Sequence, residues 1–161
     1  MNLTTIERDL EANALWTEER ALDYVRLADP QLGWLSCEAR FAVWRGGNTI
    51  GKTFAQAVDI THTARGTHPW RRVRRTPVRL LVVGYSWAQM DPLCRTLWSM
   101  LPKSEIDPCV EYVPENGVRG YKVPAIPFVA GPGRGSVIGF ATYEQGAGRI
   151  MGNQVNGAYL D

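Results

Sequence analysis

The chain has 161 residues, a formal net charge of +2 at pH 7 and a hydrophobic fraction of 45%. This length and composition fit about one globular domain and exclude a disordered or collagen-like chain. The sequence has no apolar run as long as a membrane span and no signal-peptide pattern after Met1, and its overall charge indicates no polyanionic partner.

Cysteine and histidine are too few and too scattered to suggest a metal centre. Cys37, Cys94 and Cys109 are odd in number and lack metal-ligand spacing, so we expect reduced thiols in a cytosolic protein. The two histidines, His62 and His68, exclude a histidine-rich metal site. Nothing in the sequence supports a Ser-His-Asp triad.

Residues 4–28 carry apolar side chains at helical spacing and predict one or two amphipathic helices. We expect Asp29-Pro30 to end this acidic segment. The chain then divides into an N-terminal helical arm, residues 1–30, and one main domain, residues 31–161.

The stretch Gly46–Thr53 matches the phosphate-binding pattern G-x-x-x-x-G-K-[ST] at every fixed position. Glycine lets the backbone curl so that successive N–H groups point at phosphate oxygens. Lys52 is then placed to reach the β- and γ-phosphates, and Thr53 to hold a Mg²⁺ ion. The expected nucleotide-binding residues are Gly46, Gly47, Asn48, Thr49, Ile50, Gly51, Lys52 and Thr53.

The flanks of this stretch favour a nucleotide site over a glycine-rich surface turn. Phe41–Trp44 predicts a short buried strand before it, and apolar residues at helical spacing predict a helix up to Arg65, with Gly66 just past its end. Upstream, Gln31 or Trp34 is a candidate adenine contact, with a core role as the alternative for Trp34.

The loop after that helix is the strongest local charge feature of the chain. One interpretation is contact with DNA phosphates, with Trp70 available for stacking on a base. The alternative is a solvated loop between a helix and a strand. The candidate DNA contacts are Arg71, Arg72, Arg74 and Arg75.

Downstream, strand and helix signals continue to alternate. Val78–Tyr85 is a nearly continuous apolar run, as in a buried parallel strand. Asp91-Pro92 predicts the start of a helix that Pro102 ends. The alternation predicts a doubly wound α/β fold with right-handed crossovers.

Later signals are shorter. Glu115-Asn116-Gly117 predicts a hairpin turn, and two prolines make residues 123–130 an edge strand. A glycine-rich turn at residues 131–135 and a strand at residues 136–143 follow.

The last four residues, Ala158-Tyr159-Leu160-Asp161, look like an apolar strand that ends in a carboxylate. An ATPase with a phosphate-binding loop needs such an aspartate to hold Mg²⁺. Because Lys52 and Thr53 are present, we expect Asp161 to be that ligand; otherwise it is simply where the sequence stops.

Four segments together point to a family: residues 44–53, Thr-Tyr-Glu-Gln-Gly at 142–146, Met-Gly at 151–152, and Ala-Tyr-Leu-Asp at 158–161. In this order they resemble the ATPase portion of the large terminase subunit of tailed bacteriophages, from about Gln31 to the end. The resemblance implies a P-loop NTPase-type fold of the RecA/ASCE kind, with a mostly parallel sheet flanked by helices and truncated at the Walker B strand.

The resemblance also implies an activity: ATP hydrolysis with Mg²⁺ that drives viral DNA through a portal into a preformed capsid. The implied partners are double-stranded viral DNA, the portal protein, the small terminase subunit and further copies of the chain in a ring. The implied location is the host cytoplasm, docked on the procapsid.

By residue, the resemblance gives Lys52 and Asp161 catalytic roles and makes Thr53 and Asp161 the Mg²⁺ ligands. It places Thr142–Gln145 near the nucleotide without a role. Arg45 and Arg149 are candidates for a charge-neutralising arginine, in cis or towards a neighbouring subunit.

The sequence departs from the family pattern in two places. The family's glutamate after the Walker B aspartate and its nuclease domain do not follow Asp161, so we expect a truncated N-terminal piece that binds Mg-ATP weakly and hydrolyses it poorly. Many members carry an arginine inside the loop, where this chain has Asn48. The alternatives are a helicase- or recombinase-like ATPase, or a nucleotide-binding fragment with little turnover.

Overall fold

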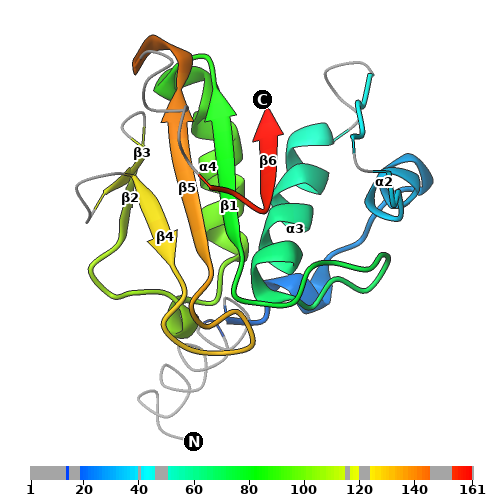
Figure 1. Ribbon diagram of the computed structural model, residues 1–161, viewed down its shortest axis with the longest axis horizontal. Coiled ribbons are helices and arrows are strands. Elements are labelled where there is room, and N and C mark those ends of the chain that lie inside the picture. The colour runs from blue at the N-terminus through cyan, green and yellow to red at the C-terminus, as the bar shows by residue number, and fades with distance from the viewer. Residues whose placement is uncertain are drawn as a thin grey trace, which may run out of the picture.

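A computed structural model describes residues 14, 19–39, 41–45, 51–114, 117–119, 124–145 and 154–160. Its centre is a four-stranded sheet in the order β4-β5-β1-β6 (Figure 1). The central strand β1 (Arg79–Gly84) pairs in parallel with β5 (Val137–Thr142) and β6 (Gly157–Leu160). The edge strand β4 (Ala125–Pro127) is antiparallel to β5. The predicted α/β class, with a mostly parallel sheet, is confirmed.

β1 is buried on both of its faces. Leu80 and Val82 belong to the main core, whereas Leu81 and Val83 form a second small cluster with Ala141. Side chains alternate between the two faces of a strand, so a strand covered on both sides needs apolar residues at every position. This is why the predicted strand reads as a continuous apolar run.

Two long helices cover one face of the sheet (Figure 1). They are α3 (Lys52–Arg65) and α4 (Trp87–Met100). α3 ends as predicted, because Gly66 adopts φ 67° and the next N–H group, that of Thr67, donates to the His62 carbonyl at 3.0 Å.

The helix α2 (Asp29–Leu35) begins where we expected the N-terminal arm to end. Proline has a helix-compatible φ and lacks only an N–H group that a first turn does not need, so Pro30 starts this helix. The Ala28 N–H group donates to Gln31 Oε1 at 2.8 Å and fixes the start. Of the predicted N-terminal helices, residues 1–13 and 15–18 lie outside the described residues; the short 3-10 helix η1 (Ala21–Tyr24) follows.

The strand predicted at Phe41–Trp44 is wrong. Residues 41–45 are irregular, and Phe41 and Val43 are 85% and 84% exposed. A strand requires a neighbour, and no described strand pairs with this segment. Trp44 instead stacks on Trp34 of α2, with ring centroids 5.6 Å apart and planes 24° from parallel.

The second long helix starts earlier than predicted. Ser86 is its N-cap and accepts a hydrogen bond from the Gln89 N–H at 3.3 Å. Pro92 therefore lies inside α4, and Asp91 is a buried acceptor for Arg95, at 2.7 Å, and for the Tyr112 hydroxyl. The prediction that Asp91 caps the helix is wrong. Ser86, five residues upstream, already accepts from an N–H group of the first turn.

The remaining elements match the sequence more closely. β2 (Glu111–Val113) and β3 (Gly117–Arg119) form the predicted hairpin, although residues 115–116 lie outside the described part. The proline-containing β4 is an edge strand, as expected. The two further 3-10 helices are η2 (Lys103–Glu105) and η3 (Tyr143–Gln145). Within the described residues, none of the helices has the length and apolar character needed to cross a bilayer.

Candidate functional site

The first turn of α3 lies at the same end of the molecule as the carboxyl ends of the parallel strands (Figure 1). Ligands of open α/β sheets bind in the crevice outside the carboxyl ends of the strands. Lys52 and Thr53, the first two residues of α3, are thus at the end where such a crevice forms.

Gly51 shows why the phosphate-binding pattern requires glycine at this position. Its backbone is left-handed, with φ 73° and ψ 31°, and a Cβ atom there would lie 2.3 Å from Gln31 Nε2. Its carbonyl accepts from the N–H group of Ala55 at 3.0 Å and from Gln31 Nε2 at 3.2 Å. The left-handed conformation favours glycine here, and a Cβ atom would also displace the end of the Gln31 side chain.

The first turn of α3 is suited to an anion. The N-cap of α3 is Gly51, which has no side chain to accept from the turn's N–H groups, and no other side-chain cap is found among the described residues. These donors and the positive end of the helix dipole attract negative charge. Lys52 and Thr53 are half-buried beside them, so the donor set fits a phosphate group.

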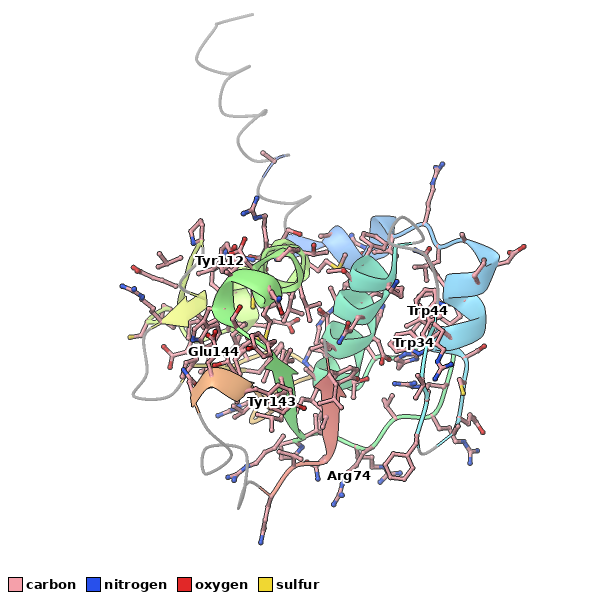
Figure 2. All side chains as sticks on the ribbon, turned by 90° about the horizontal axis from the view of Figure 1, so that it is seen from above. Trp34, Trp44, Arg74, Tyr112, Tyr143 and Glu144 are labelled. Carbon is pink, nitrogen blue, oxygen red and sulfur yellow. The ribbon has the colours of Figure 1, made fainter. Side chains whose placement is uncertain are left out.

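α2 holds the end of this loop in place. The Gln31 side chain is 8% exposed, with its oxygen bonded to Ala28 and its nitrogen to Gly51. The stack of Trp34 on Trp44 lies on the side of α3 that faces α2 (Figure 2). Trp34 Nε1 is buried without a partner among the described residues. A direct adenine contact by Gln31 or Trp34 stays a prediction.

The carboxyl end of β5 combines a buried hydroxyl with exposed polar residues. Thr142 is fully buried, and its Oγ1 has no partner among the described residues. The next residues, Tyr143 and Glu144, are exposed in η3 (Figure 2), and the Glu144 N–H donates to the Tyr85 carbonyl at 3.4 Å. This segment therefore ends beside β1, at the edge where α3 begins.

The end of β6 is oriented by Tyr159. Its hydroxyl donates to Thr63 Oγ1 at 3.4 Å, so its ring faces α3, and burial raises the pKa of this phenol well above its usual value. Thr53 lies ten residues before Thr63, or ~15 Å along the helix axis. β6 runs towards that first turn (Figure 1). Leu160, its last residue, is 70% exposed.

Several predicted site residues lie outside the described residues. Arg45, the last one described before the loop, is exposed. The residues of which nothing structural is said are Gly46, Gly47, Asn48, Thr49, Ile50, Arg149 and Asp161.

Arg71 differs from the other candidate DNA contacts because it is part of a buried cluster. Its Nη2 donates to both carboxylate oxygens of Asp59, at 2.7 and 2.8 Å, and its Nη1 donates to the Cys37 carbonyl at 3.3 Å. Asp59 is 1% exposed. The guanidinium therefore holds the loop against α3 and against the segment that follows α2, and it is not available to a phosphate group as its neighbours are.

His68 completes this cluster. Its Nδ1 lies 3.4 and 3.2 Å from the backbone N–H groups of Trp70 and Arg71 and accepts from them, so the ring proton is on Nε2 and is donated to Asp59 at 2.8 Å. Trp70 packs edge-on against His62 and His68, with centroids 5.6 and 5.7 Å away. Trp70 is half-buried, so the expectation that it is available for base stacking is not supported.

The sequence did not identify the Asp59 cluster. Asp59 falls among the apolar positions of a predicted helix, which indicates burial, but the sequence does not show which residues it pairs with. By contrast, Arg72, Arg74 and Arg75 are exposed, as the phosphate-contact interpretation requires.

Comparison with known proteins adds no relative to this picture. A scan against protein-family models, a search of curated proteins and a search of solved structures each found no match. The functional assignment therefore depends on the motifs and on the geometry at the start of α3.

Proposed function

We propose that the chain binds Mg-ATP at the start of α3 and is the nucleotide-binding part of a terminase large subunit. The observation that carries the nucleotide proposal is the Gly51-Lys52-Thr53 run at the uncapped start of α3, next to the carboxyl ends of parallel strands. The assignment to terminases is supported by the segments at residues 142–146 and 158–161. A helicase-like ATPase would share the nucleotide site but not the segment at 142–146.

The residues take distinct roles in this proposal. Backbone N–H groups of the loop and of the first turn of α3 hold the phosphate oxygens, and the Lys52 ammonium neutralises the β- and γ-phosphates. The Thr53 hydroxyl and the Asp161 carboxylate are the protein ligands for Mg²⁺. The bound ion supplies charge neutralisation on the phosphates during hydrolysis.

Gln31 positions the loop in this scheme. It donates to the Gly51 carbonyl, and its amide nitrogen lies where a Cβ atom of that residue would be. The Lys52 side chain thus starts from a backbone that α2 holds in place before a nucleotide arrives.

Hydrolysis would then drive double-stranded viral DNA into a procapsid, in a homo-oligomeric ring docked on the portal protein and supplied by the small terminase subunit. These partners belong to the family resemblance and are tested separately from the nucleotide site.

The test is nucleotide affinity measured by calorimetry with ATP and Mg²⁺. We expect Lys52→Ala to weaken binding by about 10- to 100-fold, because a charge-assisted contact contributes about 1.5–3 kcal/mol. Thr53→Ala should weaken binding in Mg²⁺ and have little effect in EDTA. Arg26→Ala, which removes an exposed charge elsewhere, is the control. Unchanged affinity in Lys52→Ala would overturn the site.

A further inference from the structure

Two long stretches of the chain contain no carboxylate. Residues 60–90 hold six arginines and residues 116–143 hold two arginines and a lysine, with no aspartate or glutamate in either stretch. Arginine in such a segment can find an acidic partner only from elsewhere in the fold. The pattern concentrates positive charge wherever the two stretches meet.

The fold brings the two stretches together at the amino end of the sheet. The Thr76 hydroxyl donates to the Pro132 carbonyl at 3.0 Å, and the Val78 N–H donates to Ser136 Oγ at 3.0 Å. The Val137 N–H then donates to the Val78 carbonyl at 2.9 Å, where β1 and β5 begin to pair. The loop before β1, residues 66–78, and the turn before β5, residues 131–135, thus form one continuous surface.

Five exposed arginines lie on this loop, on the first residue of β1 and on this turn. We call them the amino-edge basic surface: Arg72, Arg74, Arg75, Arg79 and Arg134. None of the five forms an ion pair with a residue that the structure describes. Other arginines show the contrast, because those at positions 20, 65, 71 and 95 each have a carboxylate within 2.6–2.7 Å.

Two acidic residues near this surface are paired with arginines outside it. Glu105 lies beside Gly131 of the turn but is held by Arg65 through two hydrogen bonds, at 2.7 and 2.9 Å. Asp59 is buried under the loop and paired with Arg71. Glu38 is exposed next to Cys37, whose carbonyl accepts from Arg71, and it forms no ion pair with a residue that the structure describes.

The surface is held rather than loosely attached. The Asp59 cluster ties the beginning of the loop to α3, and the Thr76 and Val78 bonds tie its end to the turn at residues 131–135. Because these anchors fix the backbone, the arginines lose less conformational freedom when they bind a ligand.

The arginines border the sheet face opposite the one that α3 and α4 cover. Arg79 alternates along β1 with Leu80 and so shares the side of Leu81 and Val83. Figure 2 shows Arg74 on this side as well, away from the two helices. From Arg72 to Arg79 the chain spans up to ~24 Å at ~3.4 Å per residue, enough to follow several phosphates of one strand.

We propose that the amino-edge basic surface binds the phosphate backbone of duplex DNA. Charge without acidic neighbours is the electrostatic footprint of a nucleic-acid partner. A duplex fits better than a single strand, because single-strand sites add aromatic platforms and the one aromatic residue of the loop, Trp70, is packed against His62 and His68. The inference deepens the proposed function, on which its choice of partner rests, because it assigns a surface to the duplex that the motor would move. This surface lies at the opposite end of the sheet from Lys52.

The experiment is fluorescence anisotropy of a labelled 30-bp duplex at several salt concentrations, without nucleotide. We compare Arg72→Ala/Arg74→Ala with Arg26→Ala/Arg119→Ala, which removes the same charge from exposed positions elsewhere. The first pair should reduce the slope of log K against log salt by about 1.8, or ~0.9 for each phosphate contact. The second pair should leave the slope near that of the parent chain.

A second variant tests whether the surface extends across both stretches. Arg79→Ala/Arg134→Ala should reduce the slope as well, whereas a loop-only contact leaves it unchanged and overturns the five-residue surface. Equal slopes for the loop pair and its control overturn the proposal, as does tighter binding of single-stranded DNA than of duplex. Circular dichroism melts of each variant establish that it is folded, and Lys52→Ala should bind the duplex like the parent chain, which separates this proposal from the nucleotide site.

Discussion

The two ends of the sheet are built in opposite ways. Towards the amino end, side chains hold the structure together: Asp59 joins Arg71 and His68, Ser136 accepts from the N–H group just before β1, and Thr76 donates to the Pro132 carbonyl. At the carboxyl end, α3 has no side-chain cap among the described residues, and Tyr85, Tyr143 and Leu160 are 59%, 53% and 70% exposed. Side-chain bonds within the protein therefore fix the amino end, whereas the carboxyl end is the exposed one.

The largest expected effect comes from breaking the amino end. Asp59→Asn removes the buried charge that faces Arg71 and His68, so the half-buried guanidinium loses its partner and the free energy of unfolding should fall by about 3 kcal/mol. Urea denaturation measures the change. Asp23→Asn, in the exposed pair with Arg20, should cost less than about 1 kcal/mol. A similar small loss for Asp59→Asn would show that the cluster does not hold this end.

Alanine substitutions at Gly133 and Gly33 test how tightly the two ends of the molecule are packed. A Cβ atom on Gly133 would lie 2.9 Å from the Ala64 carbonyl oxygen, in the turn packed under α3, so Gly133→Ala should destabilise by about 1–3 kcal/mol. Gly33 lies within α2 with nothing near its Cβ position, and Gly33→Ala should stabilise by about 0.5–1 kcal/mol. Thermal unfolding of both variants checks the opposite signs.

At the carboxyl end, Gln31 is the side chain that holds Gly51, the residue before α3. Gln31→Leu removes its bonds to Ala28 and Gly51 and should cost about 1–2 kcal/mol of stability, together with a loss of ATP affinity. Gln89→Leu makes the same chemical change at an exposed position of α4. If both variants bind ATP equally well, α2 does not position the loop.

Lowering the pH should reduce the stability of the protein gradually, through His62 near the amino end of the sheet. Burial lowers the pKa of His62 from its ordinary 6.5 to about 4, with the neighbouring His68 and Arg65 acting in the same direction. Between these values the unfolded chain binds a proton that the folded chain refuses, so the free energy of unfolding falls as the pH drops from 6.5 towards 4, by at most ~1.4 kcal/mol per pH unit. His62→Phe should flatten this part of the profile, measured by urea titrations at pH 7, 6 and 5.

The parts that the sequence predicted are those set by local rules. A nearly continuous apolar run predicted β1, a strand was predicted where β5 lies, prolines marked β4 as an edge, and Gly66 marked the end of α3. The first helix of the main domain was missed because an Asp-Pro pair serves equally well as a stop and as a first turn.

The wrong predictions depend on partners far along the chain. Phe41–Trp44 has strand character but meets Trp34 instead of a strand edge. Arg71 looks like its neighbours in the sequence, yet Asp59, twelve residues earlier on another element, decides its role. Of the candidate site, the pattern predicted Gly51, Lys52 and Thr53 at a helix start, while the grip of Gln31 on Gly51 needed the fold.

α3 also has a mechanical meaning. It is a rod of 14 residues, ~21 Å long, that carries Lys52 at one tip and, about halfway along its length, the Asp59 bond that restrains the arginine-rich loop. A pull on that loop acts on the helix through the Asp59–Arg71 pair. The helix backbone passes this load on to the tip that carries Lys52.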